Sequence, residues 1–264
     1  MLAKPHSRKA LTQFLSRFEQ TYACTNLSAE DLQWARHWRA HESRRWHDTL
    51  RLVLRTQPKR VLDVGTEFAA YAVYLKDQLG LEVCATDHPE ACARLKSYWE
   101  ALKLDVKRWD VAQREFPYEP ASFDCIIASE IVEHIPFTAE RLFKTLRTGL
   151  KPGGTLVVTT PNVHRFSNIL HLIEGKNILP PLTDDGISPP WRHVREYTPR
   201  ELCAAAEQAG YADAKIFMST CWDRPGSAGE RGFLRNALKA LWLPCSYIFP
   251  GYRSSVMLWA RNPG

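Results

Sequence analysis

From residue 59 onward, short apolar runs alternate with stretches in which apolar residues recur every three or four positions. The short runs predict strands, and the amphipathic stretches predict the helices that connect them. The predicted strands cover residues 60–64, 82–86, 105–109, 123–128, 155–160, 212–218 and 254–260. The predicted helices of this part cover residues 69–80, 89–101, 138–150 and 198–209.

Strands that alternate with helices along a chain form right-handed parallel crossovers, so helices cover both faces of the sheet. The sequence therefore predicts an α/β fold: a doubly wound, mostly parallel, Rossmann-like seven-stranded sheet. Residues 9–20 and 28–56 also show helical spacing, and Pro58 ends this part. We expect an N-terminal helical extension or lid over 1–57 and a main domain over 58–264, with residues 162–197 as a substrate-side insertion.

Composition narrows the class of protein. The chain has 264 residues, of which 45% are hydrophobic and 24% are charged, as in ordinary globular proteins. Its seven cysteines contain no Cys-x-x-Cys pair, which argues against a zinc ribbon or a disulfide framework and favours a reducing compartment. No signal peptide or spanning segment is visible, so a cytoplasmic location is expected.

Polar residues follow several of the predicted strands. In an open parallel sheet, ligands bind beyond the carboxyl ends of the strands, where the winding direction reverses. The first strand leads into Gly65, and the fourth into Ser129 and Glu130. Asp87 ends the second strand and can accept hydrogen bonds from both ribose hydroxyls of a nucleoside. Asp110 follows the third strand, where an adenine edge would lie.

Five segments together carry a family resemblance: Val61-Leu62-Asp63-Val64-Gly65, Thr86-Asp87-His88, Ser122-Phe123-Asp124 with Glu130-Ile131-Val132-Glu133-His134-Ile135, Leu150-Lys151-Pro152-Gly153-Gly154, and Thr160-Pro161-Asn162. In this order the chain resembles the class I S-adenosylmethionine-dependent methyltransferases over roughly residues 45–260, and is similar to the small-molecule type found in ubiquinone pathways. The resemblance implies S-adenosyl-L-methionine as cofactor. It implies these cofactor-binding residues: Asp63, Gly65, Thr66, Asp87, His88, Asp110, Val111, Ser129 and Glu130.

The chain departs from the family at two positions. The family usually has glycine at 67 and 69, where this sequence has Glu67 and Ala69. Glycine serves there because the backbone approaches the cofactor closely and adopts positive φ. The departure leaves open a second hypothesis, a non-catalytic binding or scaffold protein with a degenerate cofactor pocket.

A second group of residues points to catalysis. Glu130 lies three positions before Glu133 and four before His134, and with His193 these residues form a candidate Mg²⁺ or Mn²⁺ site. The pattern is similar to that of small-RNA 2′-O-methyltransferases, which leaves a metal-dependent RNA methyltransferase as a third hypothesis. Without a metal, His134 or His193 is a candidate general base, because imidazole titrates near working pH.

The acceptor side is less defined. Arg165, Trp191 and Tyr197 are the candidate substrate contacts, and the expected acceptor is a hydroxyl of a small molecule, a glycan or a lipid-linked compound. No RNA-binding module is recognisable, so nucleic acid is not expected. The apolar and basic stretch 232–252 predicts either a peripheral membrane contact or a helix that covers the sheet. The sequence indicates no oligomeric state.

Overall fold

The computed structural model describes residues 8–23, 27–113, 115–179, 192–221 and 233–264. A seven-stranded sheet forms the centre, with strand order β3-β2-β1-β4-β5-β7-β6. The strands are β1 (Arg60–Val64), β2 (Glu82–Asp87), β3 (Val106–Arg108), β4 (Phe123–Ser129), β5 (Leu150–Pro161), β6 (Ala212–Ser219) and β7 (Ser255–Arg261). Strands β1 to β5 are parallel, while β7 runs antiparallel to both β5 and β6. The predicted doubly wound, mostly parallel sheet is confirmed.

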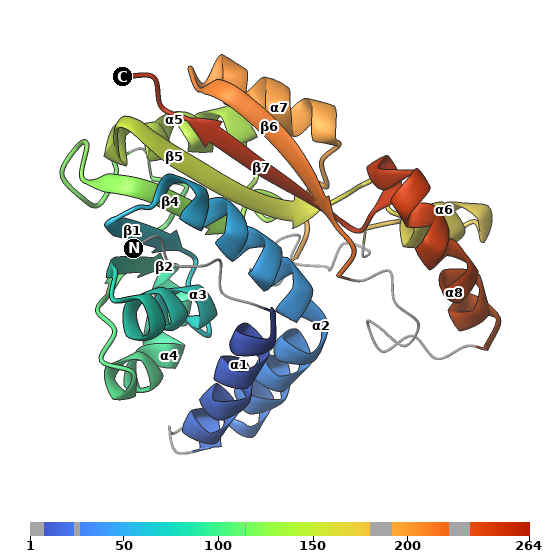
Figure 1. Cartoon of the computed structure of the whole chain (residues 1–264), viewed down its shortest axis with the longest axis horizontal. Coiled ribbons are helices and arrows are strands. Elements are labelled where there is room, and N and C mark those ends of the chain that lie inside the picture. The colour runs from blue at the N-terminus through green and yellow to red at the C-terminus, as the bar shows by residue number, and fades with distance from the viewer. Residues whose placement is uncertain (1–7, 24–26, 114, 180–191, 222–232) are drawn as a thin grey trace.

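Helices cover both faces of this sheet (Figure 1). They are α1 (Arg8–Ala23), α2 (Ala29–Val53), α3 (Ala70–Val73), α4 (Pro89–Ala101), α5 (Ala139–Gly149), α6 (Phe166–Ile173), α7 (Pro199–Gln208) and α8 (Phe233–Ile248). Four of them begin with a side-chain cap: Ser28 for α2, His88 for α4, Thr138 for α5 and Thr198 for α7. These caps accept hydrogen bonds from backbone N–H groups that have no partner within the first helical turn.

The two-residue period of the strands divides the core between the two faces. Leu62 and Ile126 point to the side of α5 and α7, and their neighbours Val61 and Ile127 pack with α1 to α3. All four side chains are fully buried. The N-terminal helices therefore share the core of the sheet, because residues of α1 and α2 pack in the same cluster as Val61.

Two elements differ from their predicted form. The turn expected at 151–154 is part of β5, which begins at Leu150; the register with β4 shifts there, and Gly153 adopts φ 78°. The helix expected over 69–80 is split, since Ala69 adopts φ 57°, α3 ends at Val73, and a wider π-type turn covers Tyr74–Gln78. Both changes follow from local irregularities that hydrophobic periodicity does not report.

Helices α6 and α8 lie side by side at one end of the molecule, away from the sheet (Figure 1). The rings of Phe166 and Trp242 stack between them, with centroids 4.6 Å apart. The interpretation that stretch 232–252 covers the sheet is therefore wrong, because its described helix packs on α6 instead. None of the described helices combines the length and the apolar character needed to cross a bilayer.

Candidate functional site

Strands β1 and β4 are neighbours, as the position of the predicted crevice requires. At the end of β1, Gly65 adopts φ 68°. A Cβ atom at this position would lie 2.2 Å from Cδ1 of Ile131, in the loop that follows β4. Glycine is thus favoured here by its backbone conformation, whereas the nearby atom is the flexible end of the Ile131 side chain and can move aside.

The carboxylate of Asp87 is held at the end of β2 by two backbone donors. The N–H of Glu67 donates to Oδ2 and that of His88 donates to Oδ1, both over 2.7 Å. Burial raises the pKa of Asp87, and these two N–H groups oppose the rise. Asp87 therefore has a fixed orientation beside Gly65, and each of its oxygens retains capacity for a further hydrogen bond.

At both positions where the family usually has glycine, the backbone of this chain is left-handed. Glu67 adopts φ 40° and Ala69 adopts φ 57°. A residue with a Cβ atom is strained in this region by roughly 1–2 kcal/mol. The loop thus keeps the conformation that glycine normally provides, and the Glu67 carboxylate lies 3.6 Å from Arg94 on α4.

Asp63 lies beneath this loop in the sheet. Its Oδ2 accepts a hydrogen bond of 2.8 Å from Thr66 Oγ1, and the residue is 2% exposed. Burial raises the pKa of Asp63 to about 7, while the bond from Thr66 opposes the rise. Asp63 and Thr66 therefore brace the loop from within, rather than facing open solvent.

A buried arginine reaches the site from α2, and the sequence analysis missed it. Arg45 is 3% exposed, and its guanidinium pairs with Glu42 of the same helix. Its Nη1 donates to Ser129 Oγ and, over 2.9 Å, to Thr159 Oγ1, and it lies 3.5 Å from Oε1 of Glu130. Burial alone would lower the pKa of Arg45, but the two carboxylates hold it above its ordinary value. The only signal in the sequence is a Glu-x-x-Arg pair within a helix whose inner face is apolar.

Three of the four candidate metal ligands come together. Glu133, His134 and His193 each place one donor atom within 4.8 Å of the others. Glu130 is outside this group, because its Oε1 accepts a 2.9 Å hydrogen bond from Thr159. The helical spacing assumed for 130–134 is wrong: Glu130 adopts φ 55° and the following residues form a turn, which directs its side chain toward Arg45.

Hydrogen bonds set the tautomers of both imidazoles. Nδ1 of His134 lies 3.0 Å from the carbonyl oxygen of Arg192, which can only accept, so Nδ1 carries the proton. Nδ1 of His193 lies 3.2 Å from Oε1 of Glu196, so this Nδ1 carries the proton as well. In the neutral form of each ring, the Nε2 lone pair is therefore available. Burial and the neighbouring His193 lower the pKa of His134, which keeps this ring neutral.

The third donor is an orphaned carboxylate oxygen. Oε2 of Glu133 accepts a 3.0 Å hydrogen bond from Thr160, while its buried Oε1 has no hydrogen-bond partner. Burial, reinforced by Glu130, raises the pKa of Glu133 well above its ordinary value. Oε1 also lies 3.8 Å from Nε2 of His134. One nitrogen of each imidazole and one carboxylate oxygen thus lie within 4.8 Å of one another, a donor set that suits a divalent transition metal such as Mn²⁺.

Glu196 connects this cluster to the start of α6. Its side chain is 1% exposed, and its Oε2 accepts hydrogen bonds from Arg165 over 2.6 Å and from Asn168 over 2.8 Å. Arg165, predicted to contact substrate, is therefore engaged by Glu196. The sequence analysis missed Glu196, because no motif separates it from a surface carboxylate.

The other predicted site residues have these positions. His88 caps α4, since its Nδ1 accepts from the N–H of Glu90, and Oδ1 of Asp110 accepts from the N–H of Ala112. Val111 packs against the core, and Tyr197 is buried within it, which favours packing as the role of Tyr197. Trp191 lies outside the described residues.

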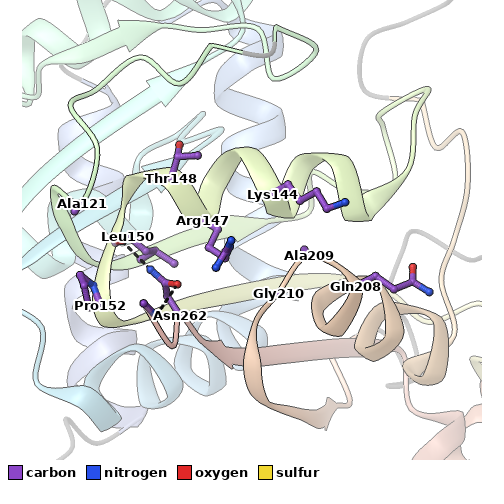
Figure 2. Close-up of a pocket in the computed structure, with 11 residues that line it drawn as sticks. Ala121, Lys144, Arg147, Thr148, Leu150, Pro152, Gln208, Ala209, Gly210 and Asn262 are labelled. Atoms are coloured by element: carbon purple, nitrogen blue, oxygen red, sulfur yellow. Dashed lines mark hydrogen bonds between the residues drawn. The ribbon is translucent and has the colours of Figure 1, made fainter.

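A separate hollow of about 620 Å³ lies at the opposite end of the sheet (Figure 2). Lys144 and Arg147 of α5, Gly210 after α7 and Asn262 after β7 are among its lining residues. It opens where β5 begins, away from the carboxyl ends of the parallel strands. The hollow is therefore not where a cofactor would meet Asp87.

Comparison with known sequences agrees with this geometry. Residues 35–216 match a family model described as a methyltransferase domain. A ubiquinone biosynthesis O-methyltransferase of Aeromonas salmonicida is 26% identical over 155 residues, which is 58% of this chain and 62% of that protein. The chain thus spans less than two thirds of the length of this relative.

Solved structures share the fold. A SAM-dependent methyltransferase of Thermotoga maritima aligns with TM-score 0.58 and 15% identity, over 88% of this chain and 95% of its own. Phosphoethanolamine N-methyltransferase 2 of Haemonchus contortus, solved with S-adenosyl-L-methionine, aligns with TM-score 0.52 and 17% identity, over 83% and 53%. At these identities the likeness establishes the architecture alone.

Proposed function

Because the chain belongs to the S-adenosylmethionine-dependent methyltransferase family, we propose that it transfers the methyl group of this cofactor to a hydroxyl of a small-molecule or lipid-linked acceptor, with help from a bound divalent cation. One observation carries the proposal. Glu133, His134 and His193 bring three donor atoms within 4.8 Å of one another, and Glu133 and His134 lie in the turn after β4, the strand that neighbours β1 and its Gly65.

The cofactor side rests on charge and backbone shape. Asp87, fixed by two N–H groups, is suited to accept hydrogen bonds from the ribose hydroxyls. Gly65 adopts the positive φ that the family's glycine has at the end of this strand. Arg45 supplies the nearest buried positive charge to Ser129 and Glu130, so it is our candidate for attracting the cofactor's carboxylate.

With two imidazoles and one carboxylate, the donor set fits Mn²⁺ better than Mg²⁺, which prefers oxygen ligands. The orphaned Oε1 of Glu133 needs a positive partner, and the neutral forms of His134 and His193 offer a lone pair on Nε2. When bound, such a cation would lower the pKa of an acceptor hydroxyl. Glu196 and the carbonyl of Arg192 hold the two rings in the ligand-competent tautomer, as partners of metal-bound histidines commonly do.

In this reaction the main task of the protein is to align the cofactor and the acceptor. The acceptor oxygen forms a bond to the methyl carbon, the carbon–sulfur bond breaks, S-adenosylhomocysteine leaves, and the hydroxyl loses its proton. Holding oxygen, methyl and sulfur in line supplies much of the rate enhancement. Where Nε2 of His134 is not occupied by a cation, it is free to take the proton, because burial and His193 keep this ring neutral.

A hydroxyl acceptor is supported by the relatives whose name is ubiquinone biosynthesis O-methyltransferase. Vicinal hydroxyls, as in a catechol, are the arrangement that a single divalent cation can bind through both oxygens. We therefore use catechol compounds as the first acceptors.

The test measures binding and transfer separately. S-adenosylhomocysteine is titrated by calorimetry, and transfer of labelled methyl from S-adenosylmethionine to a catechol panel is followed with Mn²⁺ or with EDTA. We expect binding in both conditions, transfer only with Mn²⁺, and loss of transfer in Glu133→Gln. Glu100→Gln, an exposed carboxylate on α4, is the matched control.

Each contrary result is informative. Transfer that persists in EDTA and in Glu133→Gln would remove the cation from the proposal. Absence of S-adenosylhomocysteine binding at millimolar concentration would overturn the enzyme proposal and leave the scaffold hypothesis.

A further inference from the structure

The glutamate that stands where the family usually has glycine lies beside the candidate ribose acceptor. The N–H of Glu67 donates to Oδ2 of Asp87 over 2.7 Å, and its carbonyl accepts a hydrogen bond from Nε1 of Trp99 on α4, also over 2.7 Å. These two bonds fix the backbone of Glu67 between the end of β2 and α4. The side chain of Glu67 therefore begins next to the oxygens that the ribose of a bound nucleoside would contact.

An arginine on α4 holds this side chain. Nη2 of Arg94 lies 3.6 Å from Oε1 of Glu67, while Nη1 of the same guanidinium donates to Oδ1 of Asp31 on α2. Asp31 is 5% exposed, and its other oxygen, Oδ2, accepts a 2.7 Å hydrogen bond from Oγ of the N-cap Ser28. The guanidinium is thus anchored by a carboxylate that is itself fixed, so Arg94 offers Glu67 a partner at a set place.

Arg94 counters the negative charge of three carboxylates in this part of the crevice. Burial raises the pKa of Glu67, the neighbouring Asp87 and Asp31 raise it further, and Arg94 opposes the rise. Burial raises the pKa of Asp87 as well, and there its two backbone donors, Arg94 and His88 oppose the rise. Loss of the Arg94 charge would therefore increase the repulsion between Glu67 and Asp87.

We propose that Arg94 is a positioning residue for cofactor binding: it holds the Glu67 carboxylate against α4, out of the space in which the cofactor's ribose reaches Asp87. Glycine has no side chain to place, whereas glutamate at this position needs a partner that directs it away. This role of Arg94 rests on the cofactor part of the proposed function and adds a residue to it.

A purely structural role for Arg94 leads to a different expectation. The side chains of Arg94 and Glu67 are both about half exposed, and ion pairs of exposed side chains contribute little to folding stability. If Arg94 only joined α4 to α2 through Asp31, its loss would affect cofactor binding equally whichever residue stands at position 67. If Arg94 acts on the Glu67 carboxylate, its loss should matter only while that carboxylate is present.

The experiment is a double-mutant cycle of S-adenosylhomocysteine affinity, measured by calorimetry on the full chain. Arg94→Met should lower the affinity about tenfold in the wild-type background, a coupling of ordinary size for side chains in contact. In the Glu67→Gln background the same substitution should lower the affinity by less than about twofold, because no carboxylate is left to direct. Lys96→Met removes an exposed positive charge from the same helix and should leave the affinity unchanged in both backgrounds.

Three outcomes would overturn the role of Arg94. Equal losses of affinity in the two backgrounds would leave Arg94 as a structural contact between α4 and α2, and unchanged affinity in Arg94→Met would remove any role in binding. If the wild-type chain does not bind S-adenosylhomocysteine at millimolar concentration, the proposed function fails and this role fails with it. Thermal melting of each variant identifies loss of fold, and Arg94→Gln repeats the cycle if Arg94→Met does not fold.

Discussion

His134 and His193 stand with their ring centroids 5.0 Å apart and their planes at 76°, each with Nδ1 turned away to an oxygen acceptor. The two rings come from a turn after β4 and from the chain before α7, and one nitrogen of each lies within 4.8 Å of a carboxylate oxygen of Glu133. This relationship connects the fold to its candidate chemistry.

Glu196→Gln should weaken Mn²⁺ binding. The substitution removes the charge that keeps the proton on Nδ1 of His193. Because loss of such a partner commonly lowers metal affinity about 10–100-fold, we expect a decrease of that size. Calorimetric titration with Mn²⁺ measures it without any turnover. Glu174→Gln, an exposed carboxylate at the end of α6, is the control. Unchanged affinity in a variant that melts normally would show that Glu196 has no positioning role.

Arg45→Met should destabilise the fold strongly. It leaves Glu42 and Glu130 without their shared cation in a buried setting, which typically costs about 3–5 kcal/mol. Urea unfolding gives the free energy, and Arg51→Met, an exposed residue of the same helix, should change it little. Adding Glu42→Gln to Arg45→Met should recover part of the loss. If the double variant recovers none of the lost free energy of unfolding, the guanidinium acts by packing and not by charge.

Glu67→Gly should raise both stability and cofactor affinity. Relief of the left-handed strain gains roughly 1–2 kcal/mol, and the greater freedom of glycine in the unfolded chain offsets about 0.5–1 kcal/mol of this gain. The backbone carbonyl that accepts from Trp99 Nε1 remains in place. Lys96→Gly, in the regular helix α4, should instead lose about 1 kcal/mol. If Glu67→Gly and Lys96→Gly lower the free energy of unfolding equally, the loop is not strained at Glu67.

The stability of the cofactor-free chain should fall as pH rises from about 4 to about 7, through Asp63. Its pKa is raised to about 7 by burial, so in this window the folded chain retains a proton that the unfolded chain has released. The loss should approach at most about 1.4 kcal/mol per pH unit. Urea unfolding at a series of pH values should show a flatter profile for Asp63→Asn and no change for Asp77→Asn on the exposed π-type turn. Parallel profiles for wild type and Asp63→Asn would contradict the prediction.

The local pattern of hydrophobic and polar residues was sufficient to predict the architecture of the sheet and its helices. Alternation such as that of Val61 and Leu62 fixes which side chains face each layer, and the periodicity of the helices fixes how strands connect. Residues that follow directly on a strand, such as Gly65 and Asp87, were placed as well, because strand ends in a parallel sheet meet at one edge. The N-caps Ser28, Thr138 and Thr198 also act locally, within one helical turn.

Only the tertiary structure decided which distant groups share the site. The pairing of Arg45 with Thr159, and of Glu196 with Arg165, depends on packing between elements that no local periodicity reports. The backbone of Glu130 turned left-handed and removed its side chain from the expected metal group, since one dihedral angle redirects a side chain that sequence spacing assumed to be helical. The fold was therefore determined by local pattern, whereas the donor cluster was determined by long-range packing.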